Sequence, residues 1–113
     1  CALPIYFEQL NTVIGIIATD APLNRMQLKR MSIMCHGSIS RSIHPSHTPM
    51  DGDTIFAIST SDKSHNVSEE ISKLDLTIIS SIASDTFSRA CNRAIFEAKN
   101  IGGKPSWKDL FEN

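Results

Sequence analysis

Two short apolar segments alternate with two longer amphipathic segments along the chain. The segment 12–19 is rich in β-branched residues and almost uniformly apolar, which is typical of a strand covered on both faces. The segment 54–60 has the same character and predicts a second strand. Gly15 lies inside the first strand, where a glycine indicates a close backbone approach or a local bend.

The segment from about residue 23 to residue 43 predicts an amphipathic helix. Asn24 is a suitable N-cap, and Gln27 three residues later can complete a capping box. Apolar or small residues then recur at helical spacing, while most basic residues lie off this stripe. The stripe consists of Leu28, Met31, Cys35, Ser38 and Ile39.

A second, longer helix is predicted from about residue 70 to residue 99, ended by Gly102-Gly103. Its apolar face consists of Ile79, Ala83, Phe87, Ala90 and Ala94. Its polar face consists of Ser81, Ser84, Asp85, Ser88, Arg89 and Asn92. In the tail 105–113, we expect Trp107, Leu110 and Phe111 to dock on the body of the protein.

The connections between these elements are loops. The segment 44–53 contains two prolines and a glycine, which exclude regular structure, and loops on a rigid scaffold are where chemistry tends to lie. The segment 61–70 is polar and is predicted to be a surface loop. The element order β-α-β-α gives a mixed α/β (α+β) class. Two strands are too few for a stable sheet with both faces covered, so we expect missing sequence or a partner chain.

Composition and charge argue against several classes of function. The chain has 113 residues and a net charge of -1, so no basic excess favours nucleic acid. Its apolar runs are far shorter than the roughly 20 residues of a membrane-spanning helix, and no signal peptide is evident. The cysteines are Cys1, Cys35 and Cys91, an odd number without the spacing of a zinc site. We interpret Cys35 and Cys91 as buried, small apolar residues in a reducing compartment, which predicts a cytoplasmic protein.

Thr12 and the Asp51-Gly52-Asp53 motif are the candidate site. Each stands at the start of an apolar strand, so a hydroxyl group and two carboxylates come together if the strands are neighbours. A threonine hydroxyl needs a base, and its own α-amine can serve once it becomes a chain N-terminus, with a pKa of roughly 7.7 to 8.0. This hypothesis requires cleavage between Asn11 and Thr12, which Thr12 can perform by attacking the Asn11 carbonyl.

Simpler interpretations of the same residues remain open. A threonine at a strand start is often only a β-former, and an Asp-Gly-Asp sequence is often only an acidic turn. A divalent-cation site built from His44, His47, Asp51 and Asp53 is a further possibility, although lone loop histidines are more often solvated or hydrogen-bonded.

The sequence resembles the small subunit of the DmpA-type aminopeptidase family, which includes L-aminopeptidase/D-esterases, β-peptidyl aminopeptidases and endo-type nylon-oligomer hydrolases. The resemblance covers essentially Asn11 to the C-terminus. It is carried by Asn11-Thr12-Val13-Ile14-Gly15-Ile16-Ile17-Ala18-Thr19-Asp20-Ala21-Pro22-Leu23 and by His44-Pro45-Ser46-His47-Thr48-Pro49-Met50-Asp51-Gly52-Asp53-Thr54-Ile55-Phe56-Ala57. Supporting blocks are Asp85-Thr86-Phe87-Ser88-Arg89-Ala90 and Gly102-Gly103-Lys104-Pro105-Ser106-Trp107-Lys108-Asp109-Leu110.

The resemblance implies an N-terminal-nucleophile hydrolase whose precursor cleaves itself into a large and a small subunit within an α-β-β-α sandwich. By position, Asn11-Thr12 matches the scissile bond, Thr12 the nucleophile, and Asp51 and Asp53 the acidic pair beside it. These residues look closer to the nylon-oligomer hydrolase branch, which implies amide bonds in peptides or amide oligomers as substrates. The implied partners are the large subunit and further copies in a homo-oligomer of heterodimers. No cofactor is implied, and we expect none.

The chain departs from the family pattern by lacking most of the large subunit. On this interpretation residues 1–11 are a remnant of that subunit or an artefactual leader, since Cys1-Ala2-Leu3-Pro4-Ile5 looks like translated adapter DNA, and residues 12–113 are the small subunit. The family's large subunit supplies the oxyanion-stabilising groups, so we expect the isolated chain to be inactive. The alternative function is a non-catalytic structural or assembly subunit of the same fold.

Overall fold

The computed structural model describes residues 12–62 and 71–112, which form two strands, two long helices and one short helix. The predicted order β-α-β-α is confirmed, with β1 at Ile14–Thr19, α1 at Arg25–Ser42, β2 at Thr54–Ser59 and α2 at Lys73–Glu97. A short helix, α3 at Trp107–Phe111, follows α2. Asn11, the rest of the segment 1–11 and most of the predicted loop 61–70 lie outside the described residues, so the predictions made for them stay predictions.

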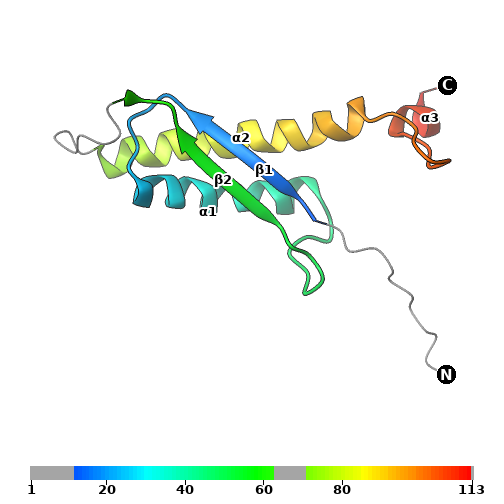
Figure 1. Cartoon of the computed structure of the whole chain (residues 1–113), viewed down its shortest axis with the longest axis horizontal. Helices are drawn as coiled ribbons and strands as arrows, with labels where there is room; N and C mark the ends of the chain where they lie inside the picture. The colour runs from blue at the N-terminus through cyan, green and yellow to red at the C-terminus, as the bar shows by residue number, and fades with distance from the viewer. Residues whose placement is uncertain (1–11, 63–70, 113) are drawn as a thin grey trace.

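The two strands pair in parallel, and both long helices cover the same face of this sheet (Figure 1). The register runs from Ile14 opposite Thr54 to Thr19 opposite Ser59. The predicted capping box of α1 is present, since Asn24 Oδ1 accepts from Gln27 N at 3.0 Å and Gln27 Oε1 accepts from Asn24 N at 2.9 Å. Mixed α/β architecture is therefore confirmed.

The core lies between the sheet and the two helices. Alternate residues of each strand point toward the helices, as the period of a strand requires. The fully or nearly buried apolar side chains are Ile17, Leu23, Met31, Cys35, Ile39, Ile55, Ala83 and Phe87. The predicted stripe of α1 is thus confirmed, with Leu28 partly buried at its start. On α2, however, Ala90 and Ala94 are exposed, so the buried part of the helix is shorter than predicted.

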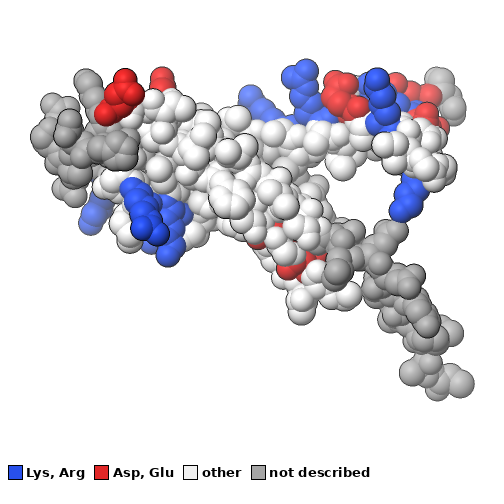
Figure 2. All heavy atoms as spheres, in the orientation of Figure 1, with Lys and Arg blue, Asp and Glu red and all other residues white. Residues whose placement is uncertain are grey.

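The opposite face of the sheet is apolar and exposed. Ile14, Ile16, Phe56 and Ile58 point away from the helices and are 42% to 73% exposed. Figure 2 shows the area over the two strands as largely free of charged side chains. Within the described residues the helices cover one face of the sheet, so the prediction that missing sequence or a partner chain covers the other face stays a prediction. A continuous apolar run indicates two covered faces, but this chain supplies only one layer of helices.

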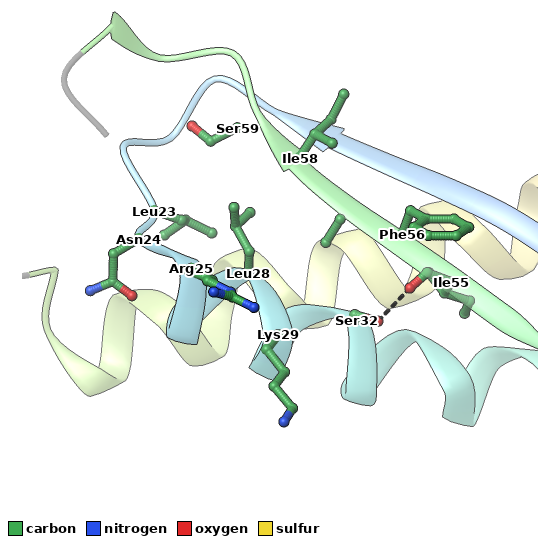
Figure 3. A pocket seen from close by; sticks show the side chains of 11 residues that line it. Leu23, Asn24, Arg25, Leu28, Lys29, Ser32, Ile55, Phe56, Ile58 and Ser59 are labelled. Atoms are coloured by element: carbon green, nitrogen blue, oxygen red, sulfur yellow. Dashed lines mark hydrogen bonds between the residues drawn. The ribbon is translucent and has the colours of Figure 1, made fainter. Parts of the chain in front are cut away.

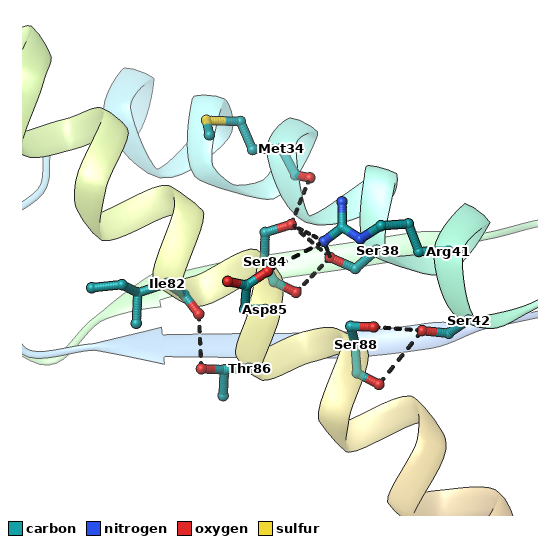
Figure 4. Close-up of polar contacts among 9 residues, drawn as sticks. All are labelled: Met34, Ser38, Arg41, Ser42, Ile82, Ser84, Asp85, Thr86 and Ser88. Atoms are coloured by element: carbon teal, nitrogen blue, oxygen red, sulfur yellow. Dashed lines mark hydrogen bonds and ion pairs between the residues drawn. The ribbon is translucent and has the colours of Figure 1, made fainter.

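A ladder of serine hydroxyls joins α1 to α2 (Figure 4). Ser38 Oγ lies 2.6 Å from the Ser84 carbonyl oxygen and 2.7 Å from Ser84 Oγ, and Ser42 Oγ lies 2.8 Å from Ser88 Oγ. Arg41 Nη2 donates to Ser84 Oγ at 3.0 Å. Ser84, which the sequence pattern assigns to the polar face of the helix, is buried. Small hydroxyl residues permit close helix approach and are recognised as interface residues only when the partner helix is known.

The C-terminal tail packs on the end of α2. The rings of Trp107 and Phe96 lie 5.5 Å apart, and Lys108 Nζ is 4.4 Å from the Phe96 ring centroid. Docking is confirmed for Trp107, whereas Leu110 and Phe111 remain 57% and 66% exposed. Within the described ranges no helix is long and apolar enough to cross a lipid bilayer.

Gly15 is a position where the fold demands glycine. A methyl group there would overlap the ring of Phe87, so a side chain, rather than the close backbone approach predicted from the sequence, makes glycine necessary here. We predict that Gly15→Ala lowers the free energy of unfolding of the full-length protein by about 1 to 3 kcal/mol, because it overpacks the core. Gly37→Ala is the matched control: a methyl group there would lie 3.7 Å from Arg41 Nη1, an ordinary contact, and should raise helix stability by about 1 kcal/mol. Chemical denaturation measures both, and equal effects would contradict the packing argument.

The two described cysteines should differ in reactivity. Cys35 is fully buried and Cys91 is partly buried, and neither forms a disulfide. Burial raises the pKa of the Cys35 thiol, an effect that Arg41 partly offsets, and burial also raises the pKa of Cys91. A raised pKa leaves less thiolate at a given pH. We predict that iodoacetamide at pH 8 modifies Cys91 slowly and Cys35 only after unfolding, as read by peptide mass spectrometry. Equal labelling in the folded protein would contradict this.

Candidate functional site

The parallel pairing brings the starts of both strands to the same end of the sheet. Thr54 N donates to the Val13 carbonyl oxygen at 2.8 Å, one residue before the first Cα pair of the ladder. Because parallel strands run in the same direction, the residues that precede them lie side by side. Thr12, which precedes β1, is therefore next to the Asp51-Gly52-Asp53 motif that precedes β2.

Thr12 lies directly against Gly52. A methyl group built on Gly52 would be 3.3 Å from Thr12 Oγ1 and 3.6 Å from Thr12 Cγ2, so the missing side chain leaves room for the threonine. Thr12 itself is exposed. The structure thus brings together the predicted nucleophile and the backbone between the two predicted carboxylates.

The carboxylate of Asp53 is held by three hydrogen-bond donors, and its side chain is only 4% exposed. Oδ1 accepts from Val13 N at 3.0 Å, which ties the residue after Thr12 to the loop before β2. Oδ2 lies 3.2 Å from His47 N and 2.9 Å from His47 Nδ1. A buried carboxylate requires such partners, because burying an unpaired charge is costly.

Asp51 shapes the loop itself. Its Oδ2 accepts from Thr48 N at 2.8 Å, while its own N–H donates to the Thr48 carbonyl oxygen at 3.0 Å. This reciprocal pair closes a tight turn of the kind that aspartate favours. The two aspartates therefore flank Gly52 from a fixed turn, and each uses its Oδ2 to hold the loop.

The four side chains of the metal hypothesis do not converge. Among residues 12–62 and 71–112, no group of three or more His, Cys, Asp or Glu side chains is arranged to hold a metal ion. Of the four, His47 and Asp53 form a pair at 2.9 Å.

His47 is the residue that sequence reasoning missed. We considered it only as a metal ligand, but it contacts Asp53 through both its backbone and its ring. Its φ of 54° lies in the left-handed region, which a sequence does not predict for histidine. The signal available in the sequence was weak: a histidine six positions before an aspartate within one Pro- and Gly-containing loop.

A groove separate from this site runs between α1 and β2 (Figure 3). Its volume is about 600 Å³, and it is lined by residues of the segments 23–32 and 55–59, which include neither Thr12 nor the aspartates. Leu23 and Leu28 face the strand in this groove. Ser32 Oγ donates to the Ile55 carbonyl oxygen at 2.7 Å and satisfies one acceptor on the free edge of β2.

Comparisons with known proteins agree on one family. The model of peptidase family S58 matches residues 4–107. A protein of Mycobacterium tuberculosis (strain ATCC 25618 / H37Rv), described as an uncharacterized aminopeptidase, is 35% identical over 107 residues, covering 89% of this chain and 31% of the relative. A similarly described protein of Mycobacterium leprae (strain TN) is 31% identical over 108 residues, covering 90% and 30%. A 6-aminohexanoate-oligomer endohydrolase of Agromyces sp. (strain KY5R) is 40% identical over 58 residues, covering 51% and 16%.

These matches confirm the resemblance to the DmpA-type and nylon-oligomer hydrolase family. The chain spans about a third of the length of the curated mycobacterial relatives it matches. No solved structure matches the chain.

The hydrogen bonds of the two aspartates predict unequal effects of their amide variants. Asp53→Asn leaves one acceptor oxygen where the carboxylate offers two, so at least one of the donors now bonded to Asp53 loses its partner. We expect it to lower the free energy of unfolding of the full-length protein by about 1 to 3 kcal/mol.

Asp51→Asn is the matched control for this measurement. It keeps an oxygen for Thr48 N, so its effect on stability should be close to zero. Denaturant titration of both variants provides the measurement. A larger loss of unfolding free energy in Asp51→Asn than in Asp53→Asn would contradict these roles of the two carboxylates.

Proposed function

Because the chain belongs to peptidase family S58, we propose that it is the nucleophile-bearing part of a self-processing amidohydrolase or aminopeptidase with Thr12 as nucleophile. The single observation that supports this most is the placement of Thr12 against Gly52, with Val13 N hydrogen-bonded to Asp53 Oδ1. A hydroxyl group at a strand start is ordinary. A hydroxyl group placed against the glycine between two aspartates, at a shared strand end, suits a threonine nucleophile with acidic partners nearby.

The first step is cleavage of the chain before Thr12. Thr12 Oγ attacks the carbonyl carbon of Asn11, the C–N bond breaks, and the nitrogen of Thr12 takes up a proton to become an amine. Water then hydrolyses the resulting ester, which releases the Asn11 carboxyl group and restores the hydroxyl. Until this cleavage, the Thr12 nitrogen is an amide and cannot act as a base.

The second step uses the new α-amine as a general base. Its pKa of roughly 7.7 to 8.0 suits proton transfer near neutral pH. The amine accepts the hydroxyl proton while Oγ attacks a substrate amide, and the proton then passes to the leaving amine. Water hydrolyses the acyl-enzyme ester. Asp53 holds the Thr12–Val13 segment in place, and Asp51 and Asp53 stabilise the ammonium form. The mechanism requires no cofactor.

The substrates we propose are amide bonds in peptides or amide oligomers. This assignment rests on the relatives described as aminopeptidases and as 6-aminohexanoate-oligomer endohydrolases. We propose a cytoplasmic location, in keeping with the thiols of Cys35 and Cys91, which form no disulfide.

The partner we propose is a large subunit cut from the same precursor. The apolar, exposed sheet face of Ile14, Ile16, Phe56 and Ile58 supports it, because exposed apolar patches mark contact surfaces. A second sheet and helix layer on that face would complete an α-β-β-α sandwich, and such heterodimers would assemble further into a homo-oligomer. The large subunit would supply the oxyanion-stabilising groups, so the isolated chain should not turn over substrate.

The test is the Thr12→Ala variant of the full-length protein. Intact mass and N-terminal sequencing should show a wild-type fragment that begins at Thr12 and an uncut Thr12→Ala chain without hydrolytic activity. Thr12→Ser keeps a hydroxyl and should still be cut. Thr77→Ala is the matched control, because that threonine is exposed on α2 and its hydroxyl donates to the Lys73 carbonyl oxygen of the same helix.

Two outcomes would refute the mechanism. A folded wild-type protein that remains uncut leaves the Thr12 nitrogen as an amide and favours the non-catalytic assembly subunit. A Thr12→Ala variant that is processed and hydrolyses amides as fast as wild type would place the nucleophile elsewhere.

A further inference from the structure

His47 is held in an unusual backbone conformation next to the proposed site. It is the one residue other than glycine with a positive φ in the segments 12–62 and 71–112. Such a conformation is uncommon for a side chain of this size and persists only where surrounding contacts fix it. Here the contacts that fix the conformation of His47 are made with Asp53.

Both donors of His47 meet the same carboxylate oxygen. The backbone N–H of His47 lies 3.2 Å from Asp53 Oδ2, and ring atom Nδ1 lies 2.9 Å from it. The left-handed backbone makes this double contact possible, because it turns the N–H and the ring of one residue toward one acceptor. The left-handed conformation of His47 therefore has a specific result: its backbone N–H and its ring both contact Asp53 Oδ2.

The other side of the ring faces α1. His47 Nε2 lies 3.3 Å from the carbonyl oxygen of His36 in α1, and the two imidazole rings are 5.1 Å apart. A continuous set of contacts thus runs from α1 through His47 and Asp53 to Val13, the residue that follows Thr12. The histidine ring itself is 37% exposed, whereas the Asp53 side chain is 4% exposed.

We propose that His47 is a positioning residue, which fixes the rotation of the Asp53 carboxylate so that Oδ1 faces the Thr12–Val13 segment. This inference rests on the proposed function. The terminal torsion of an aspartate is soft, so a carboxylate without a second partner rotates over a broad range. With Oδ2 held by His47, the other oxygen stays on Val13 N, and Thr12 keeps one orientation. His47 does not touch the reacting atoms.

Three variants separate the ring donor from the backbone conformation. His47→Gly adopts a positive φ freely but removes the ring. His47→Asn tolerates a positive φ and places an amide nitrogen near the position of Nδ1. His47→Gln places its amide near the position of Nε2 instead, where it reaches toward His36 rather than Asp53.

The experiment measures self-cleavage and amide hydrolysis in the full-length protein. We expect His47→Asn to remain within about threefold of wild type in both rates. We expect His47→Gly and His47→Gln to lose about 10- to 100-fold, through kcat with KM unchanged, because misplacing a reacting group has effects of this size. Equal loss in His47→Asn and His47→Gly, wild-type rates in His47→Gly, or a loss through KM alone would each overturn the inference.

A spectroscopic measurement guards against variants that do not fold. Wild-type full-length protein labelled with ¹⁵N at histidine should show a protonated Nδ1 for the resonance that disappears in His47→Asn. An unprotonated Nδ1 would overturn the inference. If the proposed function fails, the wild-type chain is never cut, and both the proposed function and the His47 inference are overturned. If the wild-type chain is cut normally and the His47 variants match its rates, only the His47 inference is overturned.

Discussion

The parallel alignment of β1 with β2 is the constraint on which the rest of the structure depends. Ile14 pairs with Thr54, so the residues that enter the two strands meet at one end of the sheet. A parallel pair cannot be joined by a tight turn and needs a crossover, which α1 and its flanking loops provide. The site is thus made of two segments 40 positions apart, joined by the hydrogen bond from Val13 to Asp53. A shift by one residue would turn the inward side chains of β2, Ile55 among them, away from the helices and separate Thr12 from Gly52.

Much of the fold could be predicted because local signals and tertiary packing agree. The capping box at Asn24 and the apolar stripe that includes Met31 and Cys35 define α1 without reference to anything outside it. The exposure of the second face of the sheet could not be predicted in the same way. The sequence pattern of an apolar strand is the same whether or not this chain covers that face. Ser84 was misplaced for a related reason. Its hydroxyl is satisfied by Ser38, and that partner is 46 positions away.

The candidate site also has a part that could be predicted from the sequence and a part that could not. The position of Thr12 and Asp53 before two apolar strands was visible in the sequence, since parallel pairing makes such positions neighbours. The contact of His47 with Asp53 was not visible, because it depends on a left-handed backbone, which is uncommon at any single residue other than glycine. The tight turn between Thr48 and Asp51 could be predicted only in part. Aspartate favours such turns, but the sequence does not show which N–H group donates to its carboxylate.

The serine ladder alone does not fix how far α2 is shifted along its axis relative to α1. Ser38 and Ser42 of α1 meet Ser84 and Ser88 of α2 at a constant offset of 46 positions, and Ser80 is a further rung without a hydrogen-bond partner. Sliding α2 by one turn, about 5.4 Å, would set Ser80 and Ser84 against the same two serines and restore both pairs. Serine-to-serine pairing alone therefore admits two alignments. The ring of Phe87 distinguishes them, because in the observed alignment it packs over Gly15, where even a methyl group would overlap it, so a single glycine in the sheet helps to select where a 25-residue helix lies.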